Sequence, residues 1–191
     1  SLDVELAGML GLSTLGGGVV ELDLAELDLR VHEALDAVDV SGLVGPLPLT
    51  GAGAVIEATY AGRPVTVQFD TGAAHTSVRP GLHGLLPPLE GRKETITIRG
   101  GTGGVQGVAC KRRLVRLAPF CLDPGGTVCM EELLADADVH DVDINLGTDA
   151  LWGRTLVLDL KSEQLWVSPE RRIPAEVRDA TDQIRWKDAI R

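Results

Sequence analysis

The sequence predicts a mostly β domain, and three observations carry this prediction. Aromatic residues make up only 3% of the 191 residues and hydrophobic residues 44%, so aliphatic side chains must fill the core. From residue 55 onward, short runs typical of strands are separated by glycine and proline turns. Between residues 55 and 168, helix is expected only over two brief stretches, residues 131–137 and 148–153. The length fits one sizeable core with extra arms.

Residues 1–50 are rich in Leu, Val and Asp and are expected to form an N-terminal extension. The alternation over residues 21–30 favours a strand. The apolar spacing within residues 25–38 also fits a helix, so the two periods remain open there. Glycines and prolines over residues 42–48 then predict a linker. Such an extension could serve as a pro-segment, a strap or a dimer arm.

Residues 51–168 are expected to form the central domain, built from hairpins. The first hairpin pairs residues 55–60 with 65–69 and places Asp70 at the end of its second strand. A second hairpin joins the strand at 95–99 to the strand-like stretch 105–117. The remaining expected elements are a strand at 142–146 and a closing hairpin of 155–159 and 164–167. Residues 169–191 form a charged tail, which could be a solvated helix.

The charge balance limits the partners that the chain can have. Eighteen basic and 28 acidic residues give a formal net charge of −10. Nucleic-acid affinity depends largely on Lys and Arg, so we expect no nucleic-acid partner. No apolar run reaches the roughly 18 to 20 residues of a membrane span, and the start lacks the features of a signal peptide. The localisation stays open between the cytoplasm and export with the leader removed.

Three cysteines, Cys110, Cys121 and Cys129, are too few for a disulfide scaffold. Free buried thiols are one interpretation. The other is a disulfide between Cys121 and Cys129, which flank a strong turn signal at residues 124–126 symmetrically.

The most informative motif is Asp70-Thr71-Gly72. A carboxylate directly after an apolar strand can be approached by backbone amides because Gly72 permits a tight turn. The Thr71 hydroxyl can hydrogen-bond across a symmetric interface. Two such carboxylates about 3 Å apart cannot both ionise at moderate pH and therefore share a proton. One can then act as a base on water while the other protonates the leaving nitrogen of a peptide.

Three segments occur in the order in which the retropepsin family, the single-domain aspartic proteases of retroviruses and their cellular and bacterial relatives, carries similar motifs. Residues 67–78, VQFDTGAAHTSV, resemble the active-site loop of that family. Residues 98–105, IRGGTGGV, resemble its glycine-rich flap tip. Residues 144–151, INLGTDAL, resemble the element that supports the active-site loop. The resemblance covers roughly residues 52–168.

The resemblance implies a closed or partly closed β-barrel of the retropepsin (acid protease) type, with a flap hairpin and one short helix. It implies catalytic roles for Asp70, Thr71 and Gly72. It also implies substrate contacts by the loop and the flap, namely by Ala73, Gly100, Gly101, Thr102, Gly103 and Gly104. The sequence departs from the viral pattern at Thr148, where viral enzymes usually carry arginine, in its N-terminal residues and in a longer segment from 121 to 143.

The expected function is therefore aspartic endopeptidase activity without metal or cofactor. Because Asp-Thr-Gly occurs once and Asp-Ser-Gly is absent from the sequence, a homodimer is expected to supply the second Asp70. The alternatives are a non-catalytic dimerisation or peptide-binding module with the same fold, and a latent form that processes itself.

Other residues that could carry chemistry have simpler interpretations. His75 could tune the carboxylates, but a structural histidine is the preferred interpretation. The four histidines lack metal-ligand spacing. The aspartates between residues 123 and 143 lack a regular calcium loop and fit a solvated acidic surface.

Overall fold

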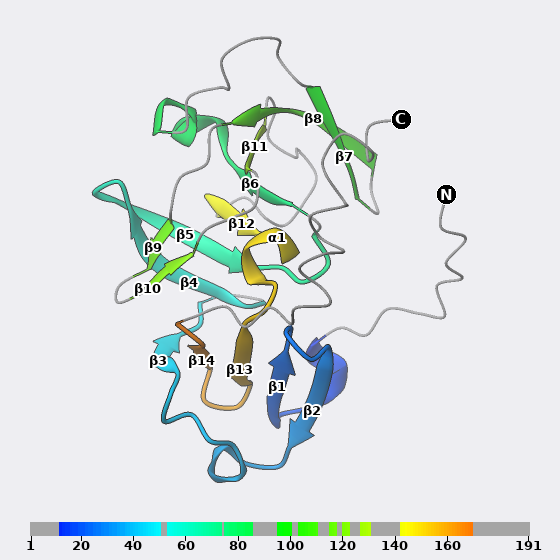
Figure 1. Cartoon of the computed structure of the whole chain (residues 1–191), viewed down its shortest axis with the longest axis vertical. Helices are drawn as coiled ribbons and strands as arrows, with labels where there is room; N and C mark the ends of the chain where they lie inside the picture. The colour runs from blue at the N-terminus through cyan, green and yellow to red at the C-terminus, as the bar shows by residue number, and fades with distance from the viewer. Residues whose placement is uncertain are drawn as a thin grey trace.

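The chain folds mainly into β-sheets, as the sequence predicts. The computed structural model describes residues 12–50, 53–73, 75–85, 95–100, 103–110, 115–117, 120–122, 127–130 and 142–169. Within them, a five-stranded sheet lies at the bottom of Figure 1 and a seven-stranded sheet above it. Neither sheet closes on itself in these residues, so the closed form of the expected barrel is not found there.

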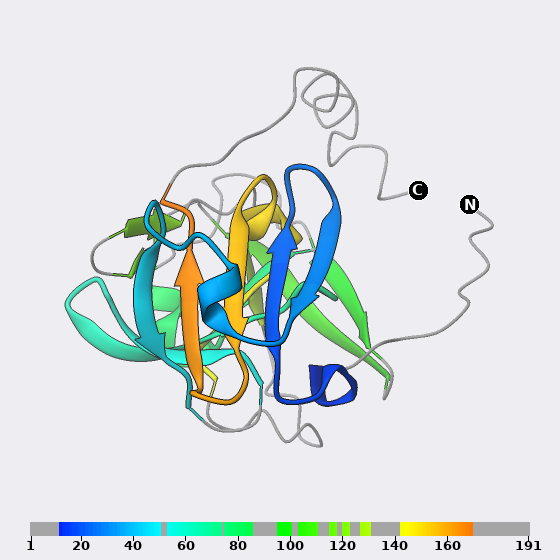
Figure 2. The same ribbon diagram turned by 90° about the horizontal axis from the view of Figure 1, so that it is seen from below.

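The five-stranded sheet has the order β2-β1-β13-β14-β3, and Figure 2 shows these strands side by side. Its strands are β1 (Val19–Asp23), β2 (Asp28–His32), β3 (Val44–Pro48), β13 (Thr155–Asp159) and β14 (Gln164–Val167). The strands from the N-terminal part of the chain thus flank the closing hairpin on both sides.

The seven-stranded sheet has the order β4-β5-β12-β6-β11-β8-β7. Its strands are β4 (Val55–Tyr60), β5 (Arg63–Phe69), β6 (Thr76–Val78), β7 (Thr95–Gly100), β8 (Gly103–Cys110), β11 (Thr127–Met130) and β12 (Ile144–Leu146). A separate two-stranded ribbon pairs β9 (Val115–Leu117) with β10 (Phe120–Leu122). The helical elements are short: η1 (Leu12–Leu15), η2 (Leu35–Ala37), η3 (Pro80–Leu85) and α1 (Thr148–Leu151).

The sequence left the N-terminal stretch open between strand and helix, and the structure resolves this in favour of strands. The helical interpretation of residues 25–38 is wrong, because a turn at residues 24–27 reverses the chain between β1 and β2. The linker predicted at residues 42–48 is also wrong, because β3 pairs with β14 there. Proline is tolerated in β3 because this strand lies at the edge of the sheet. The role of residues 1–50 as an extension remains a prediction.

The expected hairpins at 55–69 and 155–167 are confirmed. A hairpin also forms where the glycine-tipped flap is predicted, with Gly100 opposite Gly103. Gly101 and Thr102 lie outside the described residues, as do the helix predicted at 131–137 and the tail from residue 170.

The main core lies between the two sheets and is mainly aliphatic, with Tyr60 and Phe69 as its buried aromatic side chains. Val67, Ile144, Leu146, Leu151 and Leu165 are completely buried in it. Burying one such side chain stabilises a fold by about 1.5–3 kcal/mol. A smaller cluster on the outer face of the five-stranded sheet is covered by the segment after η2, which crosses that face in Figure 2.

Cys129 is buried and takes part in a disulfide. The sequence contains two other cysteines, whose side chains the structure does not describe. The expected pairing of Cys129 with Cys121 therefore remains a prediction, whereas a free thiol at Cys129 is wrong.

The Asp159 carboxylate fixes the turn between β13 and β14. Its Oδ1 accepts hydrogen bonds from the N–H groups of Lys161 and Ser162, both at 3.0 Å. Burial would raise the pKa of Asp159, but the hydrogen bonds from Ser162 and Lys161 and the Lys161 charge together lower it.

Because this pKa is lowered on folding, ionised Asp159 stabilises the fold above its unfolded pKa, and that contribution is lost as pH falls through the folded pKa. We expect Asp159→Ala to lower the free energy of unfolding by about 1–2 kcal/mol at pH 7. The difference in the free energy of unfolding between Asp159→Ala and the wild type should be smaller in acid. Urea titrations at pH 7 and in acid measure this difference, with exposed Glu163→Ala in the same turn as the control. A pH-independent gap contradicts the expectation.

Candidate functional site

Asp70 lies at the end of β5, next to β12. The two strands pair in parallel, with Gln68 opposite Asn145, and the Asp70 N–H donates to the Leu146 carbonyl at 3.0 Å. The chain then turns, because the Ala73 N–H donates to the Asp70 carbonyl at 3.2 Å. The strand pairing therefore fixes the backbone that carries the carboxylate.

Both oxygens of the Asp70 carboxylate accept a hydrogen bond. The Gly72 N–H donates to Oδ1 at 2.9 Å, as the tight turn at this glycine permits. The Asn145 Nδ2 donates to Oδ2 at 3.0 Å. Asp70 itself is half-buried, while Thr71 and Gly72 are exposed. The carboxylate is thus held in one orientation within a loop that remains open to a partner or a ligand.

Asn145 is the residue of this site that the sequence interpretation missed. It lies between Ile144 and Leu146, which are both completely buried. Successive side chains of a strand point to opposite faces, so Asn145 must point away from the core. A polar residue at the outward position of a short apolar strand, directly before the Leu146-Gly147 motif, was the available signal.

Gly147 lets β12 and α1 lie directly against the loop. A Cβ at this position would lie 2.5 Å from the His75 carbonyl carbon and 2.7 Å from its oxygen. The Thr148 N–H donates to the Ala73 carbonyl at 2.8 Å. The absence of a side chain at Gly147 is therefore what allows α1 to contact the backbone of the Asp70 loop.

Thr76 and Asp149 tie the end of the loop to α1. The Thr76 hydroxyl and N–H donate to Asp149 Oδ1 at 2.7 and 2.9 Å. The same hydroxyl oxygen accepts the Gly147 N–H at 3.2 Å. Asp149 thus takes part in the support of the loop, a role that the sequence interpretation did not assign to it.

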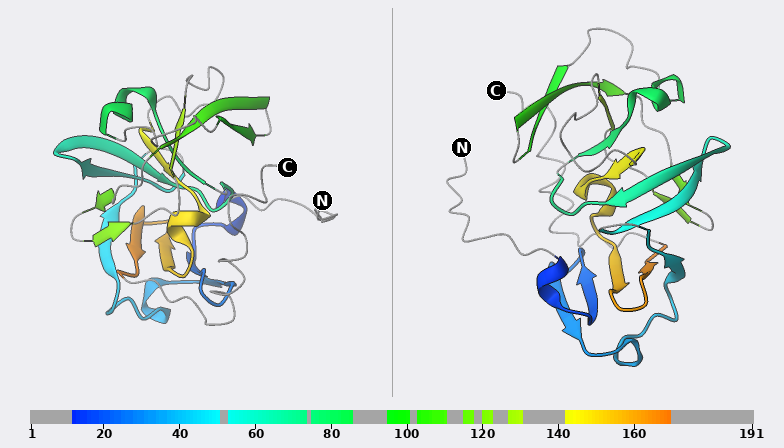
Figure 3. Two further views of the ribbon diagram at one scale, coloured as in Figure 1. Left: turned by 45° about the horizontal axis from the view of Figure 1, so that its top comes forward. Right: turned by 180° about the vertical axis from the view of Figure 1, so that it is seen from behind.

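The other expected site residues are distributed as follows. Ala73 is half-buried and lies in the same loop as Asp70. Gly100, Gly103 and Gly104 lie in the β7–β8 hairpin, on the same side of the molecule in Figure 1 as the loop that follows β5. Figure 3 shows the same arrangement from behind. His75 is half-buried, and no role in tuning the carboxylate is assigned to it.

The described part of the chain holds no group of three or more His, Cys, Asp or Glu side chains arranged to bind a metal ion. Among the same residues, no helix is long and apolar enough to span a membrane.

We expect Gly147→Ala to destabilise the protein by roughly 1–3 kcal/mol, because the new Cβ overlaps backbone atoms that cannot rotate away. Thermal and urea unfolding measure the loss. Gly84→Ala is the matched control, since a Cβ there meets no atom within 4 Å. Equal stability of the two variants would show that the loop and α1 can separate at little cost.

Neither a scan against protein-family models nor a search of curated proteins finds a match to this chain.

Proposed function

We propose that this chain is part of an aspartic endopeptidase in which Asp70 is one of two carboxylates that activate water. The observation that carries the proposal is the orientation of Asp70, whose two oxygens accept hydrogen bonds from Gly72 and Asn145 within an accessible loop. Hydrogen-bond donors aimed at both oxygens hold the carboxylate in place before a substrate binds. The similarity of three ordered motifs to retropepsins supports the same function.

The chemistry follows from a pair of carboxylates that shares one proton. The ionised member takes a proton from water, and the oxygen of that water attacks the carbonyl carbon of the peptide bond. The protonated member polarises the carbonyl oxygen. Transfer of a proton to the nitrogen then allows the C–N bond to break, which leaves a carboxylic acid and an amine. No electron is transferred to or from the protein.

The proposed substrate is a polypeptide in an extended conformation. A peptide strand can pair its backbone with the hairpin of β7 and β8, while alternate side chains point to opposite sides. The glycines at the tip of this hairpin favour close approach of backbone to backbone. Gly100, Gly101, Thr102, Gly103 and Gly104 are the proposed flap contacts, and Ala73 is the proposed contact from the loop.

The first test replaces the proposed catalytic carboxylate. In the full-length polypeptide encoded by the gene, Asp70→Asn should lower the rate of peptide cleavage by roughly 100- to 10,000-fold. The melting temperature should change little, because the amide oxygen can still accept the Gly72 N–H, and the new NH2 group can donate to Asn145 Oδ1 once the Asn145 amide turns over. A peptide library read by mass spectrometry measures cleavage, with exposed Asp39→Asn as the control. Unchanged cleavage by pure Asp70→Asn protein rules out this mechanism. If the wild type cleaves no peptide at any pH, the non-catalytic peptide-binding module is favoured instead.

The second test concerns Asn145. Asn145→Leu keeps a similar volume but removes the donor to Oδ2, so we expect kcat to fall about 10- to 100-fold. Asn145→Gln, which keeps an amide donor, is expected to recover part of the rate. A purely structural role predicts lower stability with an unchanged kcat.

A further inference from the structure

A stretch near the N-terminal end of the chain repeats the stretch that follows β12. Residues 10–31 align without a gap with residues 146–167. In this alignment Glu21, for example, corresponds to Val157. A repeat of this kind indicates one structural unit used twice. The identical pairs are Leu10/Leu146, Gly11/Gly147, Leu15/Leu151, Gly17/Gly153, Leu22/Leu158, Asp23/Asp159, Leu24/Leu160, Leu29/Leu165 and Val31/Val167.

The repeated stretches also have the same topology. In each, a short helical element, η1 or α1, is followed by an antiparallel hairpin, β1–β2 or β13–β14. The register is the same in both hairpins. Val20 lies opposite Val31 and Leu22 opposite Leu29, as Leu156 lies opposite Val167 and Leu158 opposite Leu165.

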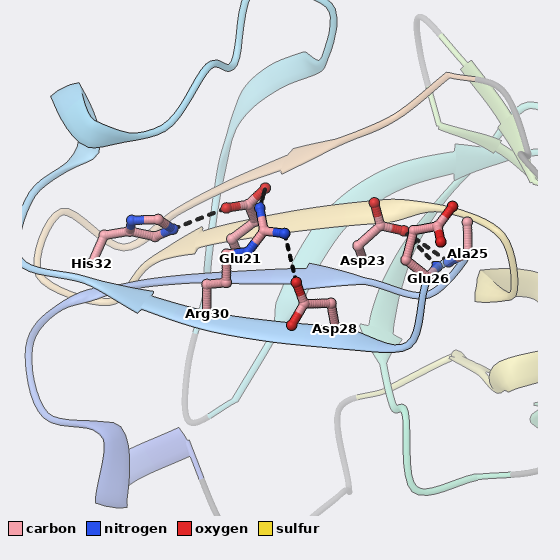
Figure 4. Close-up of polar contacts among 7 residues, drawn as sticks. All are labelled: Glu21, Asp23, Ala25, Glu26, Asp28, Arg30 and His32. Carbon is pink, nitrogen blue, oxygen red and sulfur yellow. Dashed lines mark hydrogen bonds and ion pairs between the residues drawn. The ribbon is translucent and has the colours of Figure 1, made fainter.

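The turns of the two hairpins agree in detail. The Asp23 Oδ1 accepts the N–H groups two and three residues later at 2.8 and 3.1 Å, as Figure 4 shows. Asp159 makes the corresponding two bonds in its own turn. The last turn residue has a positive φ in both, 56° at Leu27 and 52° at Glu163. Because non-glycine residues rarely adopt such values, the agreement is specific.

The two hairpins are related by a local two-fold axis. β1 and β13 pair in antiparallel fashion with Glu21 directly opposite Val157, its own counterpart in the repeat. The flanking hydrogen bonds obey the same symmetry. The Leu24 N–H donates to the Arg154 carbonyl at 2.8 Å, and the Leu160 N–H donates to the Gly18 carbonyl at 3.2 Å.

The two hairpins differ in how far their second strands are buried. Leu165 and Val167 are completely buried in the core beneath the seven-stranded sheet. Their counterparts on β2, Leu29 and Val31, are 48% and 49% exposed. Among the described residues, β2 thus lacks the cover that β14 has, whereas Val20 on β1 is buried in the main core. An apolar face of this kind marks an interaction surface.

We propose that residues 10–32 are the last element of a second lobe of the same fold, which precedes them in the polypeptide and supplies the carboxylate that pairs with Asp70. This inference rests on the proposed function. In the described lobe, Leu146 and Thr148 hold the loop that carries Asp70. The corresponding positions before and within η1 are then the support for a loop that carries the second carboxylate.

In this proposal, the second lobe of one polypeptide takes the place of the partner subunit in the homodimer expected from the sequence. β13 is paired on one side with β14 and on the other with β1. A second copy cannot add its own β13 to that edge, because β1 already occupies it. The spacing from Asp70 to Gly147, applied to Gly11, places the counterpart of Asp70 before residue 1.

The first experiment needs no catalytic activity. In the full-length polypeptide encoded by the gene, Leu29→Asp should lower the melting temperature by roughly 5–10 °C, because it puts a charge under the second lobe. Leu27→Asp is the matched control. Leu27 is 67% exposed and its counterpart Glu163 is already an exposed carboxylate, so this change should be nearly neutral.

Three results would overturn the proposal. One is an intact mass that leaves no room for a lobe before Ser1. Another is a melting temperature that Leu29→Asp leaves unchanged. The third is that Leu29→Asp lowers the melting temperature of a polypeptide of residues 1–191 by the same amount as that of the full-length polypeptide. The segment that covers Leu29 would then lie within residues 1–191.

The second experiment identifies the source of the second carboxylate. Wild-type polypeptide is mixed and refolded with an excess of Asp70→Asn polypeptide, and cleavage is measured per wild-type molecule. Two lobes in one chain predict no change and a monomer in analytical ultracentrifugation. A homodimer with mixed subunits predicts a loss in proportion to the excess, and this result together with a dimer would overturn the inference. If no mixture cleaves, the proposed protease function fails, while the melting experiment still decides whether a second lobe exists.

Discussion

The close approach of Gly147 to the backbone of His75 is the constraint on which the site depends. It lets α1 begin against the loop instead of at a distance from it, so that Thr148 can donate to Ala73 and Gly147 to Thr76. The first of these contacts joins two backbone groups, and the second joins a backbone N–H to the Thr76 hydroxyl. The position of Asp70 is thereby determined by the pairing of β12 with β5 and by one glycine, rather than by the packing of long side chains.

Local features of this arrangement could be predicted from the sequence, and long-range ones could not. The hairpins at 55–69 and 155–167 follow from alternation and turn residues that are close together in the chain. The parallel pairing of β5 with β12 joins segments far apart in the sequence, so no local pattern specifies its register. The contact of Asn145 with Asp70 depends on that register. The strand character of β3 was hidden by its two prolines, which an edge strand accommodates.

The periodicity of the N-terminal stretch does not by itself distinguish a strand from a helix. Its apolar positions fit both a strand and a helix when considered alone. Comparison with the later stretch resolves the ambiguity, since the Leu and Asp residues of the β1–β2 hairpin recur in the β13–β14 hairpin, where the turn is better marked. A repeat used twice in one sheet also explains why this stretch pairs with the closing hairpin: two related hairpins can share an edge about a two-fold axis with matched registers.

A second lobe related by sequence repeat, rather than an identical copy, would make the two carboxylates unequal. One residue before the aligned stretches, the same offset places Met9 at the position of Asn145, and the Met9 thioether has no N–H to donate. On the proposed symmetry, Asp70 receives a side-chain donor on Oδ2 that the second carboxylate lacks at the corresponding position. The repeat therefore bears on the surroundings of the two carboxylates as well as on the assembly, because Asn145 and Met9 stand at corresponding positions and differ in their capacity to donate a hydrogen bond.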